Sequence, residues 1–205
     1  MGKLLSLFDA CLAADYTGSE EGVDLALYRT GGHLYIFFQH SNGCVDWRSN
    51  FDFPAHAYTG ACGGFFAHRG FLSAFEIAKR HIAPALSERA LTRVTIVGYS
   101  HGAALALLAT ECAFCARPDL RGALEGYGFG CPRVIWGRAG EESERAFSRF
   151  TVIRNIDDLI THLPPALFGY RHVGNMLKIG ARGRYSPIDA HREENIRAEL
   201  SRAGL

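Results

Sequence analysis

The sequence predicts an α/β fold with a mostly parallel central sheet, helices on both of its faces and an N-terminal β-hairpin. Segments rich in β-branched residues alternate along the chain with segments of helical spacing, which is typical of such sheets. The segment TIVGYSHGAALALLA, from Thr95 to Ala109, places a strand directly before a helix. Two strand-like segments joined by a Gly-Gly turn indicate the hairpin.

The predicted elements follow from local patterns taken in chain order. The hairpin comprises Val23–Arg29 and His33–Phe38, and a long loop follows from Gln39 to Gly64. Apolar residues at helical spacing predict a helix over Gly70–Leu91, which Pro84 kinks or ends. The remaining predictions are strands at Val94–Val97, Gly126–Phe129, Arg149–Asn155 and Val173–Gly180, and helices at His101–Ala116 and Ile188–Ala203.

Composition restricts the class of partner. The 205 residues contain no Pro/Ser-rich linker and no internal repeat, so we expect a single domain over residues 1–205. Hydrophobic residues make up 48% of the chain and the formal net charge is +1. Because this charge gives no attraction to nucleic acid or to an acidic membrane, a small-molecule or neutral substrate fits better.

The six cysteines lie in apolar surroundings, which predicts reduced and partly buried thiols rather than a disulfide framework. Cys112 and Cys115 form a C-x-x-C pair, but they fall inside a predicted helix without a second pair or a metal-spaced histidine. We therefore interpret this pair as packing residues, not as a redox or zinc site. The cysteines are Cys11, Cys44, Cys62, Cys112, Cys115 and Cys131.

The N-terminal segment MGKLLSLFDACLAAD makes a poor signal peptide, because Asp9 interrupts its apolar residues. Nowhere does the sequence approach the roughly 20 apolar residues of a membrane span. We expect a cytoplasmic protein, with secretion left open as the alternative.

The joint between strand and helix carries a candidate nucleophile. Gly98-x-Ser100-x-Gly102 has the G-x-S-x-G spacing of a nucleophile elbow, in which a serine sits on a sharp and strained turn. A Cβ atom at either glycine position would collide with the helix where it packs back on the strand, and the helix N-terminus favours negative charge beside the serine. The alternative is a pair of glycines that simply separates a strand from a helix. A nucleophilic serine also needs a base, an orienting carboxylate and an oxyanion hole.

Candidate carboxylates follow a later strand. Asp157 and Asp158 come directly after the segment RFTVIRN, at the edge of the sheet where the elbow is expected. One of them would orient a histidine, although adjacent aspartates can also merely cap the next turn.

Several segments in order resemble the class 3 lipases, the fungal-lipase-like branch of the α/β-hydrolases. They cover most of the chain beyond His33 and end with a late histidine. The segments are FFQHSNG, DWRSNFDF, AHRGF, VGYSHGAALA, YGFGCPRV, NIDDLITHLPP and LFGYRHVG.

The resemblance implies a triad in the chain order Ser100, Asp158 and His191. Asp157 is then a neighbour at the turn, and Asn155 supports the end of the strand. His191 follows the last predicted strand on a loop that can fold over the sheet edge, which favours it as the base. His172 leads directly into a strand and is interpreted as structural.

The same resemblance implies the oxyanion hole. Its donors would be Ser41, after the second hairpin strand, and the backbone N–H of His101. The side chain of His101 is not expected to be the base, because a residue beside the elbow serine points elsewhere. Hydrogen-bonded structural roles are expected for His68 and His162.

The chain departs from the family pattern at His40, Thr161 and Ile135, which bears on substrate fit more than on catalysis. The segment NGCVDWRSN occupies the region of the lid in true lipases and is short and polar. A lid without an apolar face gains little at an oil interface, so an esterase of soluble esters is as well supported as an interfacially activated lipase. Trp47 is either a substrate contact or a buried anchor of this loop.

We therefore predict a serine carboxylester hydrolase that works without a metal or cofactor. Its partner would be a small-molecule acyl ester or a lipid, with at most transient contact with a lipid interface and no nucleic acid. Two alternatives stay open: a phospholipase, thioesterase or feruloyl-type esterase with the same machinery, and a non-catalytic binding protein of the same fold. The sequence does not settle acyl-chain preference or oligomeric state.

Overall fold

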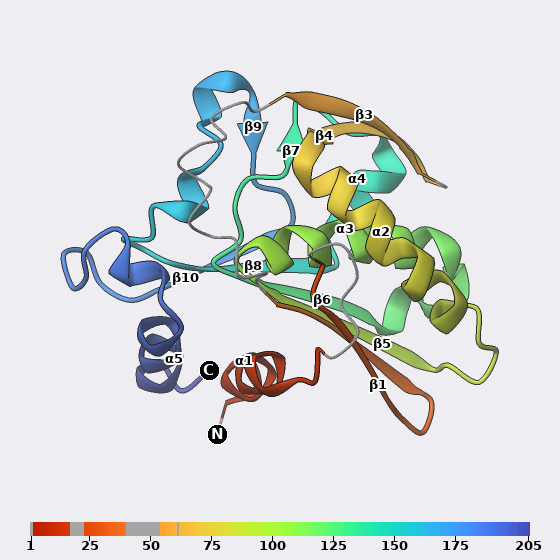
Figure 1. The fold of residues 1–205 in the computed structure, drawn as a ribbon, viewed down its shortest axis with the longest axis horizontal. Coiled ribbons are helices and arrows are strands. Elements are labelled where there is room, and N and C mark those ends of the chain that lie inside the picture. Colours follow the sequence, from red (N-terminus) through yellow and green to blue (C-terminus); the bar gives the residue numbers. More distant parts are fainter. Residues whose placement is uncertain (1, 17–22, 40–53, 61) are drawn as a thin grey trace.

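The computed structural model of the chain describes residues 2–16, 23–39, 54–60 and 62–205. Its central element is a six-stranded sheet in the order β1-β2-β5-β6-β8-β10 (Figure 1). The first two strands pair antiparallel through the predicted hairpin, and every other neighbouring pair is parallel. The strands are β1 (Leu25–Thr30), β2 (His33–Phe38), β5 (Arg93–Tyr99), β6 (Leu124–Phe129), β8 (Phe150–Asn155) and β10 (Asn175–Ile179).

Helices cover both faces of this sheet, as predicted. On one face α2 (Arg69–Leu86), α3 (His101–Ala116) and α4 (Glu141–Phe147) pack into the larger apolar cluster. On the other face α1 (Lys3–Ala13) and α5 (Glu193–Arg202) enclose the smaller one. Successive side chains of β5 point to opposite faces of the sheet, so Ile96 belongs to the larger apolar cluster and Val97 to the smaller one.

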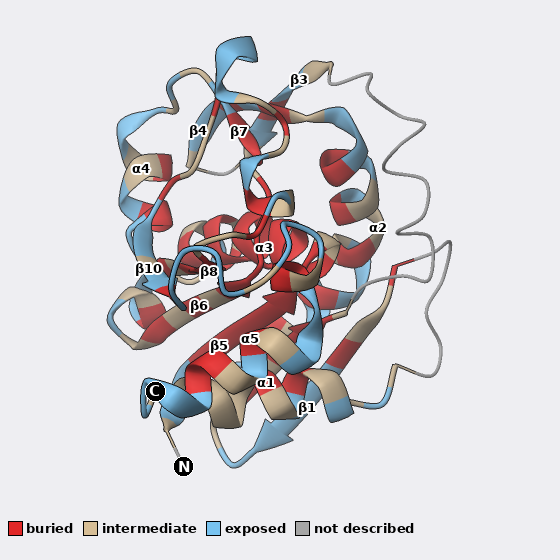
Figure 2. Ribbon diagram, turned by 90° about the vertical axis from the view of Figure 1, so that its left-hand side faces the viewer, coloured by how far each residue is buried: buried red, intermediate tan, exposed pale blue. Residues whose placement is uncertain are grey.

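Helix α3 lies at the centre of the molecule and is buried along almost its entire length (Figure 2). It packs against β5, β6 and α2, and its alanines and leucines from Ala103 to Ala113 are buried. A helix that is apolar on all sides belongs in a core. The start of this helix is therefore held rigidly against the end of β5.

A second, four-stranded sheet lies above α2 and α4 in Figure 1, in the order β3-β4-β7-β9. Its members are β3 (Ala55–Gly60), β4 (Gly63–His68), β7 (Ile135–Trp136) and β9 (Tyr170–Arg171). Our prediction of a continuous loop from Gln39 to Gly64 was therefore wrong over the β3–β4 hairpin. The hairpin buries Tyr58, Phe65 and Ala67, which explains why the segment is ordered despite its glycines.

The other boundaries differ from prediction by a few residues. Helix α3 has the predicted bounds, whereas α2 ends at Leu86, two residues after Pro84. The predicted final helix is divided into a short 3₁₀ turn, Asp189–His191, followed by α5. Further 3₁₀ turns cover Pro118–Ala123, Ile160–His162 and Ala166–Phe168.

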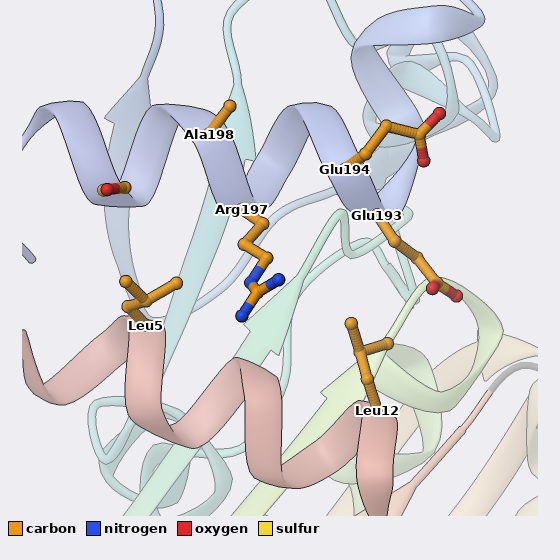
Figure 3. A pocket seen from close by; sticks show the side chains of 7 residues that line it. Leu5, Leu12, Glu193, Glu194, Arg197 and Ala198 are labelled. Atoms are coloured by element: carbon orange, nitrogen blue, oxygen red, sulfur yellow. The ribbon is translucent and has the colours of Figure 1, made fainter. Parts of the chain in front are cut away.

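The two ends of the described chain meet where α1 packs on α5. Asp9 forms an ion pair with Arg197 at 2.8 Å, and the backbone N–H of Leu5 donates to the carbonyl of Leu205. Figure 3 shows the shallow pocket between the helices, with Leu5 and Leu12 on one side and Arg197 on the other. Within the described ranges, the structure contains no helix that is both long and apolar enough to span a membrane.

One cysteine prediction is corrected by the structure. Cys62, in the turn between β3 and β4, forms a disulfide with Cys115 of α3, so these two residues are not reduced thiols. The prediction failed because it placed Cys62 in an unstructured loop, away from any helix. Among the described residues, the free cysteines are Cys11, Cys112 and Cys131, and Cys44 lies outside the described ranges.

Candidate active site

Ser100 occupies a strained turn between β5 and α3. Its φ of 56° and ψ of −120° make it the one non-glycine residue with positive φ in the part of the chain that the structure describes. Such a conformation costs about 1–3 kcal/mol and is found mainly at functional sites. The strained serine predicted from the G-x-S-x-G pattern is therefore observed.

Both flanking glycines are required by close backbone contacts. A Cβ atom on Gly98 would lie 2.2 Å from the carbonyl oxygen of Gly102, within the first turn of α3. A Cβ atom on Gly102 would lie 2.4 Å from the carbonyl oxygen of Phe38, at the end of β2. The first contact is the predicted collision with the helix, whereas the second arises from the neighbouring strand.

A continuous hydrogen-bond chain connects Ser100, His191 and Asp158. His191 Nε2 lies 2.7 Å from Ser100 Oγ, and His191 Nδ1 lies 2.8 Å from Asp158 Oδ2. All three side chains are buried, and Asp158 has no exposed surface. The structure thus brings together the predicted residues from three distant segments. The carboxylate of Asp158 accepts a hydrogen bond from Nδ1–H, which leaves Nε2 as the ring nitrogen that can accept the proton of the serine.

The loop after β8 holds Asp158 in place. Its other oxygen, Oδ1, accepts a hydrogen bond of 2.8 Å from the backbone N–H of Ile160. Asp157 instead accepts a hydrogen bond from the backbone N–H of Arg184. Asn155 donates from Nδ2 to the carbonyl of Ala190, so it supports the His191 turn as well as the end of its own strand.

Tyr99 and Gly130 shape the surroundings of His191, and sequence reasoning missed both. The Tyr99 hydroxyl donates a hydrogen bond of 2.7 Å to the His191 carbonyl, and its ring stacks on the imidazole at a centroid distance of 5.4 Å. Gly130 has a φ of +60°, and a Cβ atom there would lie 2.7 Å from the imidazole ring. The only sequence signals were an aromatic residue beside the serine and the last glycine of GYGFG.

The other histidines do not join the triad. His172 Nε2 donates to the carbonyl of Thr161 at 2.7 Å, and burial lowers its pKa to about 4. The ring of His101 packs against Phe71 of α2, with centroids 5.5 Å apart. His162 bonds to Arg154 at 2.7 Å, as expected for a hydrogen-bonded structural residue, and His68 packs against Phe71 and Tyr170.

Two guanidinium groups form hydrogen bonds with the segment that follows Asp158. Arg133 donates to the carbonyls of His162 and Pro164, and Arg154 contacts the ring of His162. Burial lowers the pKa of Arg154, while the charge of Asp158 acts in the opposite direction. Burial, followed by the two arginine charges, also lowers the pKa of His162, which favours a neutral ring.

The oxyanion hole is described only in part. The backbone N–H of His101 belongs to the first turn of α3, directly after Ser100, where helical N–H groups point toward the end of the helix. Ser41 and Trp47 lie outside the described residues, so their predicted roles stay predictions.

A serine elbow at the end of a central parallel strand, with aspartate and histidine supplied by later loops, defines an α/β-hydrolase. The chain belongs to the class 3 lipase family, since the family model described as "Lipase (class 3)" matches residues 35–168, more than half of the sequence. The resemblance inferred from the sequence motifs is confirmed.

Individual relatives agree with this assignment. A lipase from Rhizomucor miehei is 29% identical over 154 residues, which cover 69% of this chain and 40% of that protein. Lipase II from Rhizopus niveus is 26% identical with a TM-score of 0.71, covering 80% of this chain and 64% of that one. A lipase from Rhizopus microsporus var. chinensis shares the fold, with a TM-score of 0.70 at 22% identity, covering 86% and 73% of the two chains. The chain thus spans less than half the length of the curated relative that it matches.

Proposed function

We propose that this chain is a serine carboxylester hydrolase that acts through an acyl-enzyme intermediate. The observation that carries the proposal is the buried hydrogen-bond chain from Ser100 through His191 to Asp158. A binding protein of the same fold has no need of a strained serine within 2.7 Å of a histidine nitrogen. A triad with this geometry activates a hydroxyl group for attack on a carbonyl carbon.

The reaction begins when Ser100 Oγ attacks the ester carbonyl and His191 Nε2 takes the hydroxyl proton. Asp158 keeps the imidazole oriented and stabilises its protonated form. The imidazolium then protonates the leaving alkoxide, which departs and leaves an acyl-serine. Water attacks this ester with His191 again as the base, and the carboxylic acid leaves.

Negative charge on the carbonyl oxygen is stabilised by hydrogen-bond donors beside Ser100. The backbone N–H of His101 is one proposed donor, and the N-terminus of α3 adds a favourable dipole. The other proposed donor is Ser41. Loss of a single donor of this kind typically lowers kcat about 10²- to 10³-fold.

Exposed apolar residues that neighbour the triad residues in sequence suit an apolar acyl group. Leu159 follows Asp158 directly and is 45% exposed, while Ile188 lies three residues before His191 and is 55% exposed. A hydrogen bond from Leu159 N–H to the carbonyl of Pro187 brings these two segments together. We infer that the substrates are acyl esters or lipids, in keeping with the triacylglyceride lipase of Rhizomucor miehei, which is 26% identical with a TM-score of 0.62.

The proposal is tested by labelling the protein with a fluorophosphonate probe and by assaying esters of varied acyl length. We expect one covalent label, on Ser100, and loss of both labelling and hydrolysis in Ser100→Ala. The thermal stability of this variant should equal or exceed that of the wild type, because the serine side chain contributes little packing at a strained position. Turnover by Ser100→Ala near the wild-type rate would exclude Ser100 as the nucleophile.

A further inference from the structure

A second cluster of reactive side chains lies away from the triad, where the β3–β4 hairpin meets α3. Cys62 is in the hairpin turn, and its disulfide partner Cys115 is on α3, with a Cα–Cα distance of 5.4 Å. Glu111 precedes Cys115 by one helical turn, so both side chains lie on the same face of α3. One ligand atom from each of Cys62, Glu111 and Cys115 can be chosen such that all lie within 4.8 Å of one another.

Glu111 is the unusual member of this cluster. It has no exposed surface, and its Oε1 accepts a hydrogen bond of 3.1 Å from the hydroxyl of Ser143. Its Oε2 is buried without a hydrogen-bond partner. Within the described part of the chain, no lysine or arginine forms an ion pair with Glu111; Lys79, whose charge acts on Glu111, pairs with Glu76 at 3.5 Å. Burial of a carboxyl oxygen without a partner is unfavourable.

The carboxyl group faces the sulfur atoms. Cys115 Sγ lies 3.5 Å from Glu111 Oε1. Gly60, just before the turn, leaves the space that the carboxyl group occupies, since a Cβ atom there would lie 3.2 Å from both of its oxygens. A disulfide needs no carboxyl group beside it, so the disulfide alone does not explain why Glu111 is buried here. Two thiolates and a carboxylate around a common point, however, are the ligand types that bind Zn²⁺.

We propose that reduction of the Cys62–Cys115 disulfide opens a binding site for a thiophilic divalent cation such as Zn²⁺. A dithiol reductant transfers two electrons to the disulfide and is itself oxidised to a cyclic disulfide, leaving thiols on Cys62 and Cys115. The cation then displaces both thiol protons to solvent and binds the two sulfur atoms and a Glu111 oxygen. Water completes four-coordination on the open side, where both cysteines are partly exposed.

Little movement is needed to form this site. Zn–S bonds of about 2.3 Å in tetrahedral geometry place the two sulfur atoms about 3.8 Å apart, which side-chain rotation can supply once the disulfide is broken. The hairpin is linked to α3 in either state, by the disulfide when oxidised and by the cation when reduced. A cation bound through Oε2 of Glu111 also gives this oxygen the partner that it lacks in the disulfide form.

The test uses the whole chain, reduced with a phosphine, freed of metal with a chelator and kept without oxygen. Titration with Co²⁺ should give thiolate-to-metal charge-transfer absorption that saturates at one equivalent and is displaced by Zn²⁺. In the wild type, Zn²⁺ should protect Cys62 and Cys115 from alkylation while Cys112 still reacts, as read by mass spectrometry. The oxidised protein should bind neither cation at this site.

Single substitutions test each proposed ligand of the cation separately. Cys62→Ser and Cys115→Ser should lose the charge-transfer absorption, and Glu111→Gln should weaken binding at least about tenfold. Cys112→Ser is the matched control and should bind as the wild type does, since the ligand cluster does not include Cys112.

Several outcomes would overturn the proposal: no protection of Cys62 and Cys115, dependence of binding on Cys112, or full affinity in Glu111→Gln. If the reduced protein unfolds and Zn²⁺ does not restore its fold, the two cysteines serve only as a structural disulfide. If a serine variant does not fold, the alkylation pattern of the wild type still decides the question.

Discussion

Tyr99 shows how one residue beside the nucleophile can position the base. It follows Gly98 at the end of β5, where strand alternation directs it toward the face covered by α1. Phe8 of α1 packs edge-on against the Tyr99 ring, with centroids 5.6 Å apart. The hydroxyl of Tyr99 donates a hydrogen bond to the carbonyl of His191, 92 residues later. The contact connects the turn that carries the nucleophile with the turn that carries the base.

We therefore expect Tyr99→Phe to lower kcat about 3- to 30-fold with little change in KM, because the His191 turn loses a hydrogen bond worth about 1 kcal/mol. Steady-state kinetics well below the unfolding temperature would measure this. Tyr127→Phe is the control, since it removes a hydroxyl that contacts Lys3 instead of the triad. Equal losses of kcat in both variants would show that Tyr99 does not position His191.

The buried side chain of His172 leads us to expect a pH-dependent contribution to stability. Burial lowers its pKa from 6.5 to about 4, and the two nearby arginines act in the same direction. The folded protein binds a proton on His172 more weakly than the unfolded chain does. The contribution of the neutral His172 to the free energy of unfolding is therefore fully present above about pH 6.5. It is lost as the pH falls toward about 4, and amounts to at most about 3 kcal/mol.

His172→Ala should therefore lower the free energy of unfolding by about 1–3 kcal/mol at neutral pH while hydrolysis continues. The difference from the wild type should shrink as the pH falls from about 6.5 to about 4. Urea unfolding at several pH values measures this, with exposed His56→Ala as the control. Loss of activity in His172→Ala together with normal turnover in His191→Ala would instead move the base to His172.

At the scale of elements, the position of Ser100 depends on how closely α3 packs against the ends of β2 and β5. Gly102→Ala would place a methyl group 2.4 Å from the carbonyl oxygen of Phe38, and neither backbone can move away freely. We expect a loss of stability of about 1–3 kcal/mol or more, together with a lower kcat as the turn shifts. Gly122→Ala is the control, because a methyl group there would have no atom within 4 Å beyond its chain neighbours. Thermal unfolding and ester hydrolysis would show whether the two variants differ.

Elements with a strong local pattern could be predicted from the sequence, and those that depend on distant contacts could not. Helix α3 is apolar throughout and was predicted with its observed bounds. Helix α1 was missed because Asp9 interrupts its apolar residues, yet Asp9 pairs with Arg197 of α5. The β3–β4 hairpin was missed because glycines surround its turn, and β7 and β9 are too short for any periodicity to show.

The candidate site follows the same division. Ser100, Asp158 and His191 carry motif signals and were predicted, and the structure brings them together. Tyr99 and Gly130 act only through contacts with His191, which requires the fold to be known. The Cys62–Cys115 disulfide escaped prediction for a related reason, because Cys62 lies in the turn of the hairpin that was not foreseen.

At the scale of the whole molecule, the sheet order explains how one site forms from both halves of the chain. Strands β5, β6 and β8 are parallel neighbours, so the segments after Tyr99, Phe129 and Asn155 leave the same edge of the sheet. Asp158 follows the last of these strands, and the turn before α5 returns His191 to the same edge. Binding sites of open parallel sheets are found at this edge.

The polarity of the segments around this edge of the sheet allows a prediction of how the rate of hydrolysis depends on whether the substrate is dissolved or aggregated. Leu159, directly after Asp158, and Ile188, three residues before His191, already present exposed apolar side chains, and the segment NGCVDWRSN is too polar to gain much from contact with oil. We therefore expect hydrolysis of a short-chain p-nitrophenyl ester to rise hyperbolically with concentration below the solubility limit. No abrupt increase should follow when the limit is passed. A short-chain triacylglycerol followed across its own limit provides the comparison. Strong activation only above the limit, with either substrate, would indicate a lid that opens at an interface and would contradict the esterase-like behaviour expected here.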